Sequence, residues 1–95
     1  MNLLAAIASF IKVVESGSIV GAAKALGVSA AAVSQTINRL ETHLGVRLLQ
    51  RTTRRMALTE NGAVYYEKVK RIAADLESAQ SSINREDSEL QGRLS

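Results

Sequence analysis

The stretch that decides the fold is GSIVGAAKALGVSAAAVSQTINRLETHLG, residues 17–45. Serine and glycine divide it into two helical segments, 19–26 and 30–44, each preceded by a serine and followed by a glycine. A serine hydroxyl caps the start of a helix, and glycine readily adopts the left-handed conformation that ends one. A short helix, a tight turn at Gly27 and a second helix make up a helix-turn-helix arrangement.

An amphipathic helix is predicted before this stretch, over residues 3–16, because its apolar residues recur at steps of three and four. Ala22 and Ala23 are small enough to let helices cross closely. The helix over 30–44 has one apolar stripe, formed by Val33, Ile37, Leu40 and Leu44. The sequence therefore predicts a unit of three packed helices.

The pattern changes after Gly45. Two short aliphatic runs, 46–49 and 55–58, flank the polar and basic segment QRTTR at residues 50–54. We interpret them as a two-stranded hairpin with a basic tip, called the wing below. The predicted fold class is mainly α: a winged helix-turn-helix of three helices and a small two-stranded wing, followed by a long helix.

The last helix is predicted from an N-cap at Thr59 to about Glu89, a length of about 45 Å at 1.5 Å per residue. Its apolar positions follow alternating steps of four and three, which is typical of a helix that pairs with another helix. Packing on the chain's own domain is the alternative, but the length of the helix argues against it for the distal half, since residues beyond about Leu76 have no further domain to cover. The predicted dimer interface consists of Tyr65, Val69, Ile72, Leu76, Ala79 and Ile83.

Composition argues against several classes of protein. The chain has 95 residues, no cysteine and one histidine, His43, so disulfides, thiol nucleophiles and a metal site are not expected. No apolar run approaches the ~18 residues of a membrane span. Seven basic and two acidic side chains give residues 1–58 a net charge of +5, whereas residues 59–95, with five basic and seven acidic, carry −2. A basic patch confined to one module is typical of nucleic-acid binders.

The face of the 30–44 helix opposite its apolar stripe contains no acidic residue. Ala31, Gln35, Asn38 and Thr42 lie along it, with Ser34 and Arg39 on its flanks. Glutamine and asparagine can pair bidentately with adenine, serine reaches phosphate or base, and alanine contacts the thymine methyl. An ordinary solvent face would look similar, but the glycine turn and the arginine-rich wing nearby favour DNA binding.

A spaced set of residues also carries a family resemblance. It comprises Gly17-Ser18-Ile19, Ala22-Ala23, Leu26-Gly27-Val28-Ser29, Ala32-Val33-Ser34, Ile37, Leu40-Glu41, Leu44-Gly45-Val46, Leu48-Leu49, Arg51-Thr52 and Leu58-Thr59-Glu60-Asn61-Gly62. The set closely resembles the N-terminal DNA-binding region of LysR-type transcriptional regulators, in the branch with an Arg-Thr-Thr-Arg-Arg wing. The resemblance implies a winged helix-turn-helix, a recognition helix that opens at Ser29, and a linker helix that dimerises antiparallel.

The resemblance also implies individual roles. Ser34 and Gln35 would face DNA, Arg51 would contact the backbone, and Arg54 and Arg55 would reach phosphate or the minor groove. Family members often carry Gln-Pro where this chain has Ala30-Ala31, and often Arg in place of Gln35. Base reading is therefore expected to shift toward Gln35, Asn38 and the wing.

We expect residues 1–58 to form the winged module, with the helix-turn-helix at about 19–38. Residues 59–90 are expected to form the linker helix and residues 91–95 a hinge stub. The effector-binding domain of the family is expected to be absent. The predicted DNA-binding residues are Ser29, Ala30, Ala31, Ser34, Gln35, Asn38, Arg39, Arg51, Thr53, Arg54 and Arg55. No catalytic residue, metal or cofactor is expected.

The expected function is sequence-specific binding of double-stranded DNA at a pseudo-palindromic operator, to regulate transcription. The protein would act as a homodimer in the cytoplasm, associated with the nucleoid, and a full-length parent could assemble further into a tetramer. The alternative is a coiled-coil interaction adaptor with an incidental basic module. An enzyme is not expected, because Ser34 and His43 lie well apart around the helix and no aspartate is placed to orient the histidine.

Overall fold

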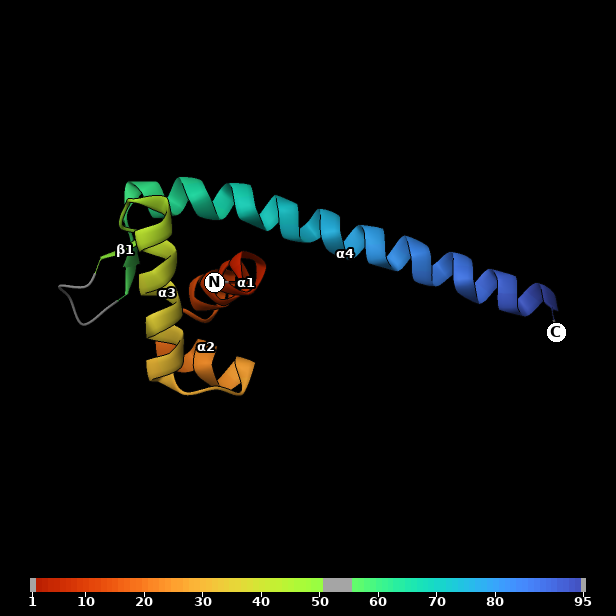
Figure 1. Ribbon diagram of the computed structural model, residues 1–95, viewed down its shortest axis with the longest axis horizontal. Helices are drawn as coiled ribbons and strands as arrows, with labels where there is room; N and C mark the ends of the chain where they lie inside the picture. The colour runs from red at the N-terminus through yellow and green to blue at the C-terminus, as the bar shows by residue number, and fades with distance from the viewer. Residues whose placement is uncertain (1, 51–55, 95) are drawn as a thin grey trace.

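The computed structural model describes residues 2–50 and 56–94, with side chains in the last helix described as far as residue 83. Three short helices and a small sheet form one body, and a fourth, long helix extends from it (Figure 1). Their bounds are α1 Leu3–Ser16, α2 Ile19–Leu26, α3 Ala30–Leu44, β1 Leu49–Gln50, β2 Ala57–Leu58 and α4 Glu60–Leu94. The predicted winged helix-turn-helix class is confirmed.

Polar caps and left-handed glycines set the bounds of the first three helices. The Ser18 and Ser29 hydroxyl oxygens accept hydrogen bonds from backbone N–H groups of the first turns of α2 and α3, at 2.9 and 3.1 Å. Gly27 ends α2 at φ 70°, where a residue with a Cβ would be strained. Its N–H donates to carbonyls of the last turn of α2, so α2 and α3 are joined by a tight turn of fixed geometry.

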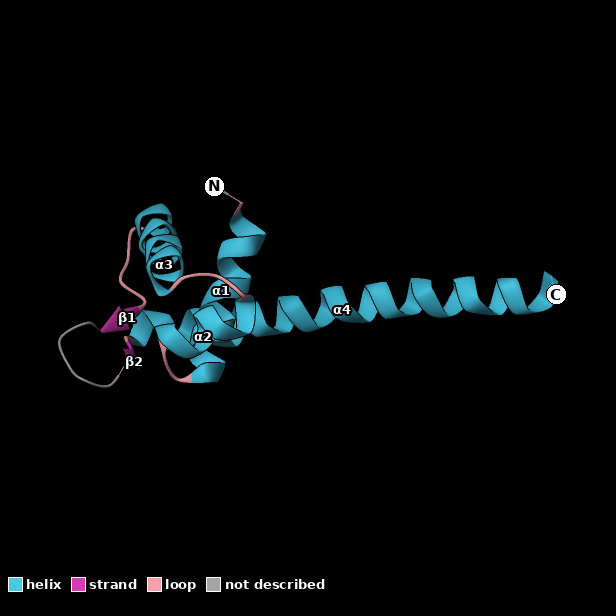
Figure 2. Cartoon of the chain, turned by 90° about the horizontal axis from the view of Figure 1, so that it is seen from below, coloured by secondary structure: helices cyan, strands magenta, loops and turns pink. Residues whose placement is uncertain are grey.

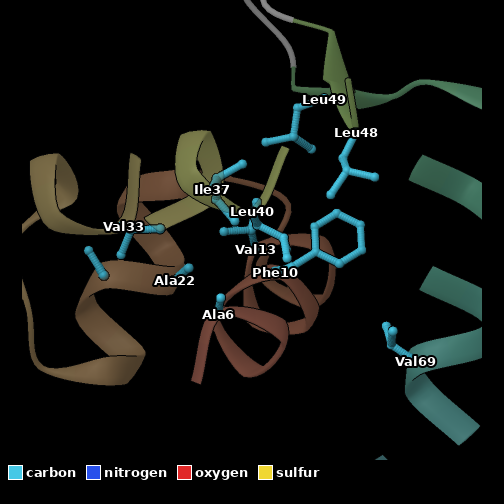
Figure 3. Close-up of a cluster of buried hydrophobic side chains, with 11 residues drawn as sticks. Ala6, Phe10, Val13, Ala22, Val33, Ile37, Leu40, Leu48, Leu49 and Val69 are labelled. Atoms are coloured by element: carbon cyan, nitrogen blue, oxygen red, sulfur yellow. The ribbon is translucent and has the colours of Figure 1, made fainter. Parts of the chain in front are cut away.

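The core lies where α1, α3 and the start of the sheet meet (Figure 3). Phe10, Val13, Ile37, Leu40 and Leu48 are among its fully buried side chains. Each such side chain contributes roughly 1.5–3 kcal/mol by burial, so this aliphatic cluster with one phenylalanine holds the three helices together. Ala22 is also fully buried, in agreement with the predicted close helix crossing.

The sheet is smaller than the sequence predicts. β1 and β2 are antiparallel, with Leu49 opposite Leu58 and Gln50 opposite Ala57. The predicted strands began at Val46 and Arg55, but residues 46–48 are not in a strand, because the backbone there is bonded to α3 and to the residue before α4 instead. Gln50, the first residue of the predicted tip, belongs to β1, and residues 51–54 of the tip lie outside the described residues.

Helix α4 begins directly against the backbone of Leu48. The Thr59 N–H donates to the Leu48 carbonyl at 3.0 Å, and the Thr59 hydroxyl donates to the Arg47 carbonyl at 2.6 Å while accepting from the Gly62 N–H at 2.9 Å. Gly62 packs on the same Leu48 carbonyl, which the Cβ of any other residue would overlap. Thr59 is therefore the N-cap of α4, as predicted.

Helix α4 then runs past the rest of the molecule as a single extended arm (Figure 2). The longest extent of the chain is 59 Å, against 25 and 23 Å in the other directions. The helix continues to Leu94, so the prediction of an end near Glu89 and a hinge stub over 91–95 was wrong for residues 91–94. A lone Gly92 costs a helix only about 1 kcal/mol, which is too little to end one without a proline or a cap.

We predict that Gly62→Ala destabilises the fold, although alanine is the better helix former. The added methyl group must displace either α4 or Leu48, at a cost of about 1–3 kcal/mol in the free energy of unfolding. Urea denaturation followed by circular dichroism measures this change. Asn61→Ala, at the exposed neighbouring position, is the control and should stay near wild type. A Gly62→Ala variant as stable as Asn61→Ala would contradict the close contact.

Candidate nucleic-acid interface

Helix α3 presents a polar face to solvent. Val33, Ile37 and Leu40 are buried on its inner side. The predicted DNA-binding residues of α3 and its cap lie on the outer side, where Ser34 is half-buried and the others are exposed: Ser29, Ala30, Ala31, Gln35, Asn38 and Arg39. The structure thus brings these seven residues together along one helix.

Hydrogen bonds within the helix decide which polar groups of this face remain available. The Ser29 hydroxyl oxygen serves as the N-cap, and the Thr36 and Thr42 hydroxyls donate to the carbonyls of Ala32 and Asn38 at 2.9 and 3.0 Å. Gln35 and Asn38 make no side-chain hydrogen bond to any residue that the structure describes. Toward the described residues, their amide groups are therefore free to bind a partner, as are the Ser34 hydroxyl and the Arg39 guanidinium group.

A surface hollow of about 460 Å³ connects the C-terminal end of α3 with the segment before β1. Asn38, Thr42 and Arg47 line it together with Glu41, Gly45 and Val46. The Arg47 side chain is 69% exposed, and its Nη1 lies 3.9 Å from the Glu41 Oε1. The Arg47 guanidinium group thus lies beside the face that carries the Gln35 and Asn38 amides. The predicted wing residues Arg51, Thr53, Arg54 and Arg55 lie outside the described residues.

Glu41 is the structurally important residue that sequence reasoning missed. Its residue exposure is only 7%, and its Oε2 accepts hydrogen bonds from the Leu48 and Leu49 N–H groups at 2.7 and 3.2 Å. The carboxylate therefore fixes β1 to the side of α3. A signal was present in the sequence, because Glu41 directly follows the buried Leu40 and is the one acidic residue of α3.

We predict that Glu41→Ala lowers the free energy of unfolding by about 2–4 kcal/mol, because two buried N–H groups lose their acceptor. Glu41→Gln keeps one acceptor oxygen and should cost clearly less, since a neutral acceptor is weaker than a carboxylate but still present. Urea denaturation of the two variants separates the effects. Equal losses for alanine and glutamine would show that the acceptor oxygen is not what Glu41 contributes.

The predicted interface of α4 divides into two parts. Val69 is 2% exposed and belongs to the core, and Tyr65 is half-buried beside Phe10 with ring centroids 5.7 Å apart. Ile72, Leu76 and Ile83 are 51, 48 and 66% exposed, and Ala79 is exposed too. Val69 was thus wrongly assigned to a surface that a partner could cover, because heptad spacing does not distinguish a partner helix from the chain's own domain.

Two side chains of α4, Tyr65 and Lys70, have shifted pKa values. Burial raises the pKa of the Tyr65 phenol. A hydrogen bond from Lys70 to Glu67, supported by their charge attraction, raises the pKa of the Lys70 ammonium group. The Lys70 Nζ also lies 5.4 Å from the centre of the Tyr66 ring. Tyr65 therefore stays neutral and Lys70 charged around neutral pH.

Among the described side chains, those of residues 2–50 and 56–83, no group of three or more from His, Asp and Glu could hold a metal ion. No helix in that part of the chain is both long and apolar enough to span a membrane.

A glycine-linked helix pair, a polar exposed second helix and a two-stranded wing define a winged helix-turn-helix protein. The profile described as "Bacterial regulatory helix-turn-helix protein, lysR family" matches residues 4–63. The chain belongs to this family of bacterial regulators.

Proteins with similar sequences or structures support this family assignment. An "HTH-type transcriptional regulator" of Xanthomonas campestris pv. campestris (strain 8004) is 52% identical over 85 residues, which is 90% of this chain and 25% of that protein. The chain thus spans about a quarter of the length of this curated relative. In a crystal structure titled as a complex of the BenM DNA-binding domain with catB site 1 DNA, the protein chain is 29% identical, with a TM-score of 0.83 over 90% of this chain and 94% of that one. The chain of a CbnR DNA-binding domain–DNA complex is 36% identical, with a TM-score of 0.74 over 93% and 97%.

Proposed function

We propose that this chain binds double-stranded DNA sequence-specifically and thereby regulates transcription. The proposal is carried by the face of α3 on which the Gln35 and Asn38 amides are exposed and make no side-chain hydrogen bond to a described residue. Arg39 and Arg47 lie beside them. The similarity of the chain to the BenM and CbnR DNA-binding domains, both crystallised in complex with DNA, supports the same function. The named relatives are regulators, and we expect no catalytic activity.

In this proposal α3 enters the major groove. Gln35 and Asn38 read base edges, Ala30 and Ala31 contact thymine methyl groups, and Ser29, Ser34 and Arg39 contact phosphate or base. Arg47 neutralises phosphate at the C-terminal end of α3. The residues of the wing, Arg51, Thr53, Arg54 and Arg55, would add backbone or minor-groove contacts. Phosphate contacts make the affinity salt-dependent, and base contacts make it selective.

We propose that residues 1–58 form the DNA-binding module and that α4 pairs two copies of the chain. The exposed stripe of Ile72, Leu76, Ala79 and Ile83 is the surface that a second copy would cover. A dimer of this kind presents two recognition helices to a pseudo-palindromic site with half-sites about one helical turn, ~10 bp, or a multiple of it apart. We also propose that the protein is located in the cytoplasm. For a longer parent protein, we propose an effector-binding domain and assembly into a tetramer.

Gln35→Ala should relax selectivity. Losing a bidentate contact to adenine costs about 1–3 kcal/mol at the preferred site and nothing on a random duplex. Fluorescence anisotropy with both duplexes at one salt concentration measures the difference. Gln80→Ala makes the same change at an exposed position of α4 and is the control. Equal losses on both duplexes would exclude Gln35 from base reading, and no binding by the unmodified chain would refute the function itself.

Leu76→Asp should dissociate the dimer, because a charge placed in a helix–helix seam loses its hydration without gaining a partner. Sedimentation equilibrium is expected to give the monomer mass for this variant and the dimer mass for the unmodified chain. Ser78→Asp adds the same charge on another face of α4 and should remain dimeric. A Leu76→Asp variant that stays dimeric would place the interface elsewhere.

A further inference from the structure

Two contacts, separated along α4, fix the direction in which the helix leaves the module. The first is at its start, where Thr59 is bonded to the Arg47 and Leu48 carbonyls and Gly62 packs on Leu48. The second is two turns further on, where Val69 points into the core around Phe10 (Figure 3). Beyond this second contact the apolar positions Ile72, Leu76 and Ile83 are exposed.

The first contact acts as a fixed pivot for α4, and the second determines how far α4 lies from the core. The first contact cannot slide, because two hydrogen bonds and a glycine with no room for a Cβ hold it. The second consists only of apolar packing, in which Val69 is 2% exposed and Phe10 lies 5.7 Å from the Tyr65 ring centre and 6.4 Å from that of Tyr66. A change in the size of the side chain at position 69 would therefore alter the tilt of α4.

We propose that Val69 is a specificity-determining residue that acts at a distance, by setting the spacing between the two half-sites that a dimer prefers. This inference rests on the proposed DNA-binding dimer. Val69 is buried against its own module, so it neither pairs with the second copy nor touches DNA. Its effect passes through the angle between α4 and α3.

Because of how α3 and α4 are arranged, a change in the angle between them displaces one end of α3. α3 lies crosswise to α4, with its C-terminal end beside the start of α4 and its N-terminal end farthest from it (Figure 1). A tilt about the pivot therefore moves the N-terminal part of α3, with Ala30 and Ala31, along the direction of α4. In a dimer paired through α4, both recognition helices move along that line in opposite senses.

The expected displacement is close to one base pair. Gly62 and Val69 are about 10 Å apart along the helix, and α3 is about 22 Å long, at 1.5 Å per residue. A helix shift of about 1 Å at Val69, at the lower end of those seen at interfaces, tilts α4 by about 5°. The far end of α3 then moves by about 2 Å, and the two helices of a dimer together by about 4 Å, against about 3.4 Å per base pair.

The test uses the full chain with Val69→Ala and Val69→Leu. Each variant is titrated with duplexes that carry two copies of the half-site selected by the unmodified chain, separated by a series of spacings in single-base-pair steps. Val64→Ala is the matched control, because it removes the same atoms from an exposed position on α4. Circular dichroism and sedimentation first establish that each variant is folded and dimeric, and Val69→Ile replaces the leucine variant if leucine is not accommodated.

We expect the preferred spacing to move by about one base pair in opposite directions for the smaller and the larger side chain, and to stay unchanged for Val64→Ala. Variants that keep the original optimum, with affinity unchanged or equally reduced at every spacing, would overturn the inference and leave DNA binding intact. An unmodified chain without any preferred spacing would refute two-site binding by a dimer, and the role of Val69 with it.

Discussion

The backbone of Leu48 is the point on which the arrangement of the other elements depends. Its N–H donates to the Glu41 carboxylate of α3, and its carbonyl accepts from Thr59 and lies against Gly62 at the start of α4. Its side chain is fully buried in the core. One residue thus fixes α3, the first strand of the wing and the long helix relative to one another. A displacement there would change the position of all three at once.

Sequence reasoning located the first three helices and the start of the fourth because the signals that set those bounds are local. A serine oxygen three residues before the N–H that it accepts, or a glycine at a left-handed helix end, depends only on neighbouring residues. The amphipathic pattern of α3 depends equally on local periodicity, so the buried stripe and the exposed Gln35 and Asn38 could both be derived from it.

The features that sequence reasoning missed depend on contacts between distant parts of the chain. The sequence marks Glu41 only as the one acidic residue of α3. That its side chain is buried depends on partners that follow after a turn of the chain, at Leu48 and Leu49. The sequence also does not show that Gly62 packs against the Leu48 carbonyl, which precedes it by two strands of the chain. The repeat in α4 gave the apolar positions correctly, but it could not assign Val69 to the core and Leu76 to the surface.

The division of α4 between core and surface explains why module and helix form one functional unit. A unit of about sixty residues buries only about 60% of its surface and is marginally stable alone. Here the start of α4 completes the core through Val69 and the two tyrosines that contact Phe10. The helix that presents the exposed stripe is therefore the helix that stabilises the module. In the proposed dimer, the side chains that hold each module to its own α4 would therefore also determine the relative position of the two modules.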